Sequence, residues 1–275
     1  MKKLLMVFLL VGIVVFSGCT NQGGIKGSGS GDGVKISSFI VDPPEVEGGE
    51  TVYLLMDIQN VGGAIAQNIR AELIGLPSGW GGVGNPAGNP GTLYPPEKGI
   101  QGEIATIQWT LTSPPSRTDI DYPVEGQITY DYSTKSETLV RLVSRDWLMK
   151  LPYDQREAER KKQGVVSGGL QLGPIHATVK PASTSGDSLI LDIQNVGNGY
   201  PKDNRITIQF DGITCNNLNS GSTIELIRGK NRQYRCNPTQ TSTEQWQNVR
   251  VDVTLTYTYI TKASTNIRVL GTPTG

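Results

Sequence analysis

Few residues in this chain are suited to catalysis. The 275-residue sequence contains a single histidine, His176, between Ile175 and Ala177. One imidazole cannot build a metal site or a Ser-His-Asp triad by itself. The sequence also lacks the Gly-x-Ser-x-Gly, P-loop and His-Glu-x-x-His patterns. We therefore expect a protein without enzymatic activity or cofactor, in which His176 has a structural or surface role.

Two groups of carboxylates are close enough in sequence to suggest chemistry. Asp119 and Asp121 precede an expected strand, and Glu45, Glu47 and Glu50 lie in an early loop. Carboxylates at such spacing can hold calcium between extracellular domains, and a facing pair can hydrolyse a glycosidic bond. Because nothing in the sequence brings these acids together, we expect turn and solvation roles and assign no metal site.

Two aromatic residues are candidates for ligand contact. Trp80 lies in the glycine- and proline-rich residues 79–91, and Tyr94 follows soon after. An exposed aromatic ring can stack on the C–H face of a sugar, which makes a glycan a candidate ligand. The alternative for Trp80 is packing in the core or at the rim of a domain. Trp109 alternates with apolar neighbours and is expected in the core.

The N-terminus has the features of an export signal. Lys2 and Lys3 precede an apolar run over residues 4–16, which is short for a membrane span of about 20 residues. The tetrapeptide Phe-Ser-Gly-Cys that follows resembles a lipobox, although Phe16 stands where Leu, Val or Ile is usual. The resemblance implies lipidation at Cys19 and a location on the extracellular face of the membrane. The alternative is a single uncleaved transmembrane anchor.

The remaining cysteines, Cys215 and Cys236, are predicted to form a disulfide. An even pair of cysteines outside the cytoplasm is normally oxidised. Closing a loop of this length stabilises a fold by about 3 kcal/mol in the chain-entropy account. A redox or metal pair is the alternative, but no other cysteine or histidine lies nearby in the sequence.

An internal repeat predicts the fold. The hexapeptide Asp-Ile-Gln-Asn-Val-Gly occupies residues 57–62 and again 192–197, and a Tyr-x-Tyr motif at residues 130–132 recurs at 257–259. Apolar and polar residues alternate around both motifs, which is the period of a half-buried strand. Each copy contains about seven strand-like runs, as sandwich domains do. We predict an all-β protein of two tandem immunoglobulin-like β-sandwiches.

The first copy resembles a known family of modules. After Asn60-Val61-Gly62 it continues with Ala66, Asn68-Ile69 and the segment Gly-Leu-Pro-Ser-Gly-Trp80, an order similar to extracellular Ig-like modules of the CARDB and NEW3 type. The resemblance is weaker in the second copy, which lacks the Leu-Pro-Ser-Gly-Trp segment. Such modules occur in surface proteins, adhesins and secreted enzymes, so the resemblance implies a fold and no particular activity.

The expected organisation has six parts. They are a signal peptide that forms a signal or anchor helix (1–18), a flexible Gly/Ser-rich tether (19–33), domain 1 (34–143), a linker (144–172), domain 2 (173–270) and a tail (271–275). Within the linker, Asp154 and Glu157 resemble a capping box for a short helix over residues 155–163. The apolar residues Trp147, Leu148, Met149 and Leu151 are expected at the domain junction, with partner docking as the alternative.

Charge narrows the choice of partners. With 25 acidic and 25 basic residues the chain has no net positive charge that would attract nucleic acid.

We expect a non-catalytic, membrane-anchored surface protein that is structural or adhesive and binds a protein partner at the cell surface. The alternative is a carbohydrate-binding surface module or an accessory subunit of a secreted enzyme.

Overall fold

A computed structural model describes residues 31–84, 86–182, 188–240 and 245–272. These residues form mostly antiparallel β-sheet with little helix, which confirms the predicted all-β class. The signal peptide, Cys19 and the last three residues of the tail lie outside the described residues. Among the described residues, the helices are too short and too polar to cross a lipid bilayer.

The elements follow one another in two series of strands separated by two helices. The first series is β1 (Val34–Asp42), β2 (Glu45–Glu47), β3 (Thr51–Asn60), β4 (Ala66–Ile74), β5 (Thr92–Leu93), β6 (Ile104–Thr112) and β7 (Ile120–Val143). Next come α1 (Arg145–Lys150) and α2 (Tyr153–Arg160). The second series is β8 (Gly164–Gly168), β9 (Ile175–Pro181), β10 (Leu189–Asn195), β11 (Tyr200–Pro201), a 3-10 turn (Lys202–Asn204), β12 (Arg205–Asp211), β13 (Ile213–Cys215), β14 (Ser222–Glu225), β15 (Asn231–Pro238) and β16 (Trp246–Leu270).

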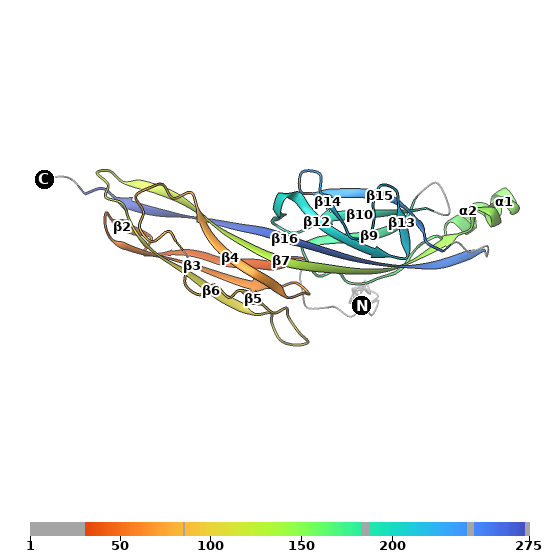
Figure 1. The fold of residues 1–275 in the computed structure, drawn as a ribbon, viewed down its shortest axis with the longest axis horizontal. Helices are drawn as coiled ribbons and strands as arrows, with labels where there is room; N and C mark the ends of the chain where they lie inside the picture. Colours follow the sequence, from red (N-terminus) through yellow and green to blue (C-terminus); the bar gives the residue numbers. More distant parts are fainter. Residues whose placement is uncertain (1–30, 85, 183–187, 241–244, 273–275) are drawn as a thin grey trace, which may run out of the picture.

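Two long strands organise the molecule. β7 and β16 pair antiparallel without interruption from Ile120 opposite Val269 to Val143 opposite Trp246. We call this pair the ribbon; at about 3.3 Å per residue it is roughly 80 Å long. Figure 1 shows it running through two lobes, the first containing β1–β6 and the second containing β9–β15. We call the point where the lobes meet, around residues 130–132 and 257–259, the waist.

One face of the ribbon is buried along most of its length. In β7 the even-numbered residues from Val124 to Leu142 face the interior, and in β16 the odd-numbered residues from Val249 to Tyr259 do so. The sheet β1-β3-β6 covers this face in the first lobe, and β13-β15-β10-β9 covers it in the second. Figure 1 shows these sheets on opposite sides of the ribbon. The strands of the ribbon twist along their length, so the buried face points in opposite directions in the two lobes.

The two lobes do not coincide with the two predicted domains, because each long strand contributes to both lobes. The second half of β7 pairs with β8 and bonds to β9, where the Ser136 hydroxyl donates to the carbonyl of Ala177. The end of β16 pairs with β2 in the first lobe. Residues 34–143 and 173–270 therefore do not close as separate segments, since each lobe includes part of the long strand from the other repeat.

The repeated tyrosines meet at the waist. Tyr132 lies opposite Tyr257 and Tyr130 opposite Tyr259, with neighbouring ring centroids 5.9–6.3 Å apart. All four rings are buried, so the cluster belongs to the cores of both lobes. The Tyr130 hydroxyl accepts a hydrogen bond from the backbone N–H of Val34, which fixes the start of β1 at the waist.

The repeated asparagine closes the same loop in each lobe. Asn60 donates its side-chain amide to the carbonyls of Ala64 and Leu93, and its oxygen accepts from the N–H of Gly62. Asn195 likewise donates to the carbonyls of Gly199 and Gly229 and accepts from the N–H of Gly197. The Asn-Val-Gly motif therefore has a structural role.

The helices lie at one end of the molecule, so the expectation that their apolar residues pack at the domain junction is wrong. Ser144, which caps α1, donates its backbone N–H to Gln245, next to the start of β16. Leu148 is buried here, whereas Met149 and Tyr153 are exposed. We call α1 and α2 with these exposed side chains the helical tip; it stands at the right-hand end of Figure 1.

Local details of the second helix also differ from expectation. α2 begins at Tyr153 after Pro152, and no side chain caps it, so the predicted box from Asp154 is not formed. Glu157 forms an ion pair with Arg160. The Arg156 guanidinium instead holds the two helices together through the carbonyls of Met149 and Leu151.

The predicted disulfide is confirmed. Cys215 in β13 lies directly opposite Cys236 in β15, and the two sulfur atoms are bonded. The bridge joins the edge strand of the second lobe's small sheet to its neighbour.

Candidate functional site

Trp80 packs inside the first lobe. Its side chain is only 8% exposed, and its ring meets that of Tyr122 edge-on with centroids 5.3 Å apart. The indole Nε1 is buried and has no hydrogen-bond partner among the described residues. This placement matches the packing alternative and leaves no open face of Trp80 for a sugar.

Tyr94 is 60% exposed, but it lies far from Trp80. Gly81, next to Trp80, exchanges backbone hydrogen bonds with Thr112 at one end of β6, whereas Tyr94 accepts from the N–H of Glu103 just before the other end. The nine residues of β6 span roughly 25 Å. The two aromatic residues singled out in the sequence therefore do not form one site.

Other exposed apolar residues lie on the same loop as Tyr94. The loop from Tyr94 to Ile104 carries exposed side chains at both ends and at its tip, because Ile100 and Ile104 are also more than half exposed. Pro96 and Ile100 line a hollow of about 230 Å³ together with Val61. We call Tyr94, Ile100, Ile104, Pro96 and Val61 the Tyr94 surface. Its loop projects below β5 and β6 in Figure 1.

Tyr94 stood out in the sequence as a candidate for ligand contact, whereas the two isoleucines of this surface did not. Ile100 and Ile104 flank Gln-Gly-Glu in a stretch with several turn-forming residues. Isolated apolar residues in such a stretch carry no period, and periodicity was the signal that selected core positions. Their exposure follows from the backbone, since the N–H of Ile100 bonds to the carbonyl of Glu97 in a tight turn that leaves the side chain outside.

Arg268 lies between the two sets of carboxylates that were candidates for calcium binding, Asp119/Asp121 and Glu45/Glu47/Glu50. Arg268 donates to Asp119 at 3.0 Å and lies 4.0 Å from Glu45. The N–H of Gly271 and then the Arg268 guanidinium hold the pKa of the Asp119 carboxyl below its ordinary value. Within the part of the chain that the structure describes, no group of three or more His, Cys, Asp or Glu side chains could hold a metal ion.

The titratable groups of the interior are poorly suited to acid–base catalysis. Burial raises the pKa of Tyr132 and of Tyr259 to about 12, and it raises that of Tyr130 well above its usual range. These hydroxyls therefore stay protonated near neutral pH and serve as hydrogen-bond partners. Burial lowers the pKa of His176, which is about half-buried in β9.

A polar groove of about 550 Å³ opens on the outer side of the waist. Its floor includes Asp131 and Thr258, and Lys202 and Arg205 stand on the side of the second lobe. Both oxygens of Asp131 are occupied, one by the Thr258 hydroxyl at 2.6 Å and the other by the Asn68 amide at 2.8 Å. This carboxylate therefore stabilises the waist and is not free to act as a base.

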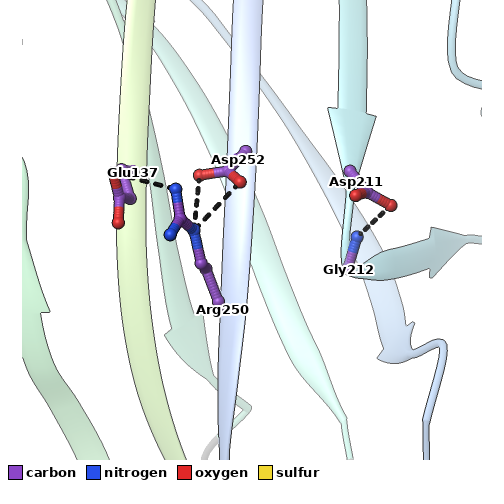
Figure 2. A network of polar contacts seen from close by, with 5 residues as sticks. All are labelled: Glu137, Asp211, Gly212, Arg250 and Asp252. Carbon is purple, nitrogen blue, oxygen red and sulfur yellow. Dashed lines mark hydrogen bonds and ion pairs between the residues drawn. The ribbon is translucent and has the colours of Figure 1, made fainter.

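A charge network ties the two strands of the ribbon in the second lobe. Glu137 lies opposite Asp252, and Figure 2 shows Arg250 reaching both, at 3.2 and 3.1 Å. Asp211 stands on the next strand and accepts a hydrogen bond from the N–H of Gly212. Facing carboxylates repel, so Arg250 offsets this pair. Because all three partners are largely exposed, the net stabilisation is under about 1 kcal/mol.

Comparison with known proteins assigns no family. No protein-family model and no curated protein sequence matches the chain. Among solved structures, similarity is found to the secreted serine protease VesC from Vibrio cholerae, at 9% identity and a TM-score of 0.21, covering 81% of this chain and 48% of that chain. The collagen adhesin (CNA) from S. aureus matches at 11% identity and a TM-score of 0.11, covering 85% and 92%. At these TM-scores neither structure supports an argument about fold or function.

Proposed function

We propose that this protein is a non-catalytic cell-surface protein, anchored to the membrane at its N-terminus, that acts as a structural or adhesive module and binds another protein. The observation that carries the proposal is the ribbon. Because one uninterrupted ladder passes through both lobes, it makes them a single stiff body. A stiff body of this length suits a spacer that presents a binding surface at a fixed place.

The anchor in this proposal is Cys19, preceded by the signal peptide. The disulfide supports an oxidising location outside the cytoplasm, since such bonds persist there and are rare in the cytosol. The proposal also treats the lobes as Ig-like modules of the CARDB and NEW3 type. The matching loop contacts of Asn60 and Asn195 support their common origin.

The helical tip is the proposed contact surface for a protein partner. It stands at the end of the ribbon, about 40 Å from the waist at 3.3 Å per residue. Met149 is 63% exposed and Tyr153 is 79% exposed, and Trp246 close by is 47% exposed beneath the Arg141 guanidinium. Met, Tyr, Trp and Arg are the residue types enriched in protein interfaces.

The test places a photo-crosslinking amino acid at Met149 in living cells. A matched variant carries the same amino acid at Lys161, which is exposed just beyond α2 and is not one of the exposed apolar residues near the helical tip. We expect a discrete crosslinked species from position 149 and none from position 161, together with digestion of the protein by protease added outside intact cells. Protection from external protease, or identical products from both positions, would contradict the proposal.

The carbohydrate-binding alternative now rests on Tyr94 alone, because Trp80 is buried. A glycan array probed with the protein and with Tyr94→Ala separates the two functions. Binding that disappears in the variant would favour the alternative.

A further inference from the structure

The described chain begins at the waist, next to the Tyr94 surface. The carbonyl of Gly33 accepts the N–H of Val61 at 2.9 Å, and the Asp32 carboxylate accepts the N–H of Asn198 in the second lobe. Val61 itself lines the hollow that contains Ile100. The N-terminal segment therefore joins the body midway along its length, beside the loop that carries the exposed isoleucines.

The length of chain between Cys19 and this point limits how far the body can stand from its anchor. Fourteen residues, at about 3.5 Å each, reach at most roughly 50 Å, and the coil dimensions predicted by a Gly/Ser-rich composition average about 20 Å. Each arm of the ribbon extends about 40 Å from the waist. An anchor attached at mid-length by so short a segment favours a body that lies along the membrane with its waist close to the lipid.

We propose that the Tyr94 surface is the face that rests on the lipid bilayer. This inference rests on the proposed membrane anchor and adds the orientation of the body on it. Tyr94, Ile100 and Ile104 are each more than half exposed on one short loop, and apolar side chains with a tyrosine among them partition into the boundary between headgroups and acyl chains. The loop also carries the adjacent and exposed Glu97 and Lys98, whose charges cancel, and the Glu103 carboxylate accepts the N–H of Tyr94.

The second lobe supplies a matched control for this contact. Its equivalent hairpin carries one exposed isoleucine, Ile227, which is 60% exposed against 68% for Ile100. The loop closed by Asn60 at Leu93 corresponds to the loop closed by Asn195 at Gly229. Figure 1 shows β14 and β15, which flank this hairpin, on the opposite side of the ribbon from β3 and β6. Ile227 is therefore expected to face away from the bilayer.

The experiment uses the full lipidated protein in vesicles of phosphatidylglycerol and phosphatidylethanolamine, with and without brominated acyl chains. Ile100→Trp and Ile227→Trp each add one exposed indole to the same background of native tryptophans. We expect bromine to quench the added emission of Ile100→Trp and to leave that of Ile227→Trp unchanged. We also expect the emission of Ile100→Trp to shift to shorter wavelength on vesicle binding.

Two outcomes separate this inference from the proposed anchor. If both variants float with the vesicles and neither added indole is quenched, the anchor stands and the lipid-facing surface is refuted. If neither floats, the anchor itself fails, and the inference fails with it. Equal quenching of both variants would mean that the body has no preferred orientation, which would also refute the lipid-facing surface.

Amide hydrogen exchange gives a second readout. We expect exchange of residues 94–104 to slow on vesicles in the wild type and not to slow in a variant that combines Tyr94→Ser, Ile100→Ser and Ile104→Ser.

Discussion

The two lobes share a hexapeptide, and comparing its copies shows which of its residues specify the fold. Asn60 and Asn195 make the same three kinds of contact, each closing a loop of its own lobe. The aspartates three positions earlier differ. Asp57 accepts from the hydroxyls of Ser38 and Thr106, whereas Asp192 is 3% exposed and accepts from Gln194. The asparagine therefore makes equivalent contacts in both lobes, whereas the contacts of the aspartate differ between the lobes.

The largest expected effect comes from removing an equivalent tyrosine from each repeat. Tyr130→Ala and Tyr257→Ala should each lower the free energy of unfolding by about 3–5 kcal/mol, because each deletes a buried ring from the shared waist. In both variants chemical denaturation followed by circular dichroism should still give one transition, since the ribbon couples the lobes. Tyr53→Ala, at an exposed position, should change stability far less. Two separate transitions would show that the lobes unfold independently.

A smaller effect is expected at the loop asparagines. Asn60→Ala and Asn195→Ala should each cost about 2–3 kcal/mol, because the carbonyls and the N–H that each side chain satisfies lose their partner. Asn60→Asp keeps the acceptor for Gly62 but sets a buried carboxylate against the carbonyls of Ala64 and Leu93, so it should cost at least as much as Asn60→Ala. Urea midpoints measure the three changes. A cost at only one of the two asparagines would contradict their equivalence.

The smallest effect is the acid sensitivity due to Asp57. Hydrogen bonds from Thr106 and then Ser38 lower the pKa of its carboxyl, so the ionised form stabilises the fold. This contribution is complete above the ordinary value near 3.9 and is lost as pH falls through the lower folded value. We expect Asp57→Asn to reduce the loss of stability below about pH 4 by under about 1 kcal/mol. Thr106→Ala should act in the same direction, and an unchanged acid slope in both variants would refute the assignment.

Period-two alternation predicted the β-class, and the cysteine count predicted the bridge, but neither could predict the ribbon. Alternation looks the same whether a strand continues or folds back. The stretch from Tyr132 to Val140 contains no Gly, Pro, Asn or Asp, the strongest turn-forming residues, although Ser133 and Ser136 also occur in turns. That absence was the available signal for a continuous β7.

The sequence also could not predict how far Trp80 lies from Tyr94. The loop between them runs along β6, where Ala87 exchanges backbone hydrogen bonds with Gln108, and no sequence pattern indicates this path.

The exchange of long strands also sets the order in which the two lobes can close during synthesis. The end of β16, with Ile267 and Val269 fully buried, belongs to the first lobe, yet it is synthesised after β8–β15 of the second series. The lobe that is begun first is thus completed last. Until those residues arrive, the first lobe keeps an open sheet edge, so the second series of strands is made before the first lobe can close.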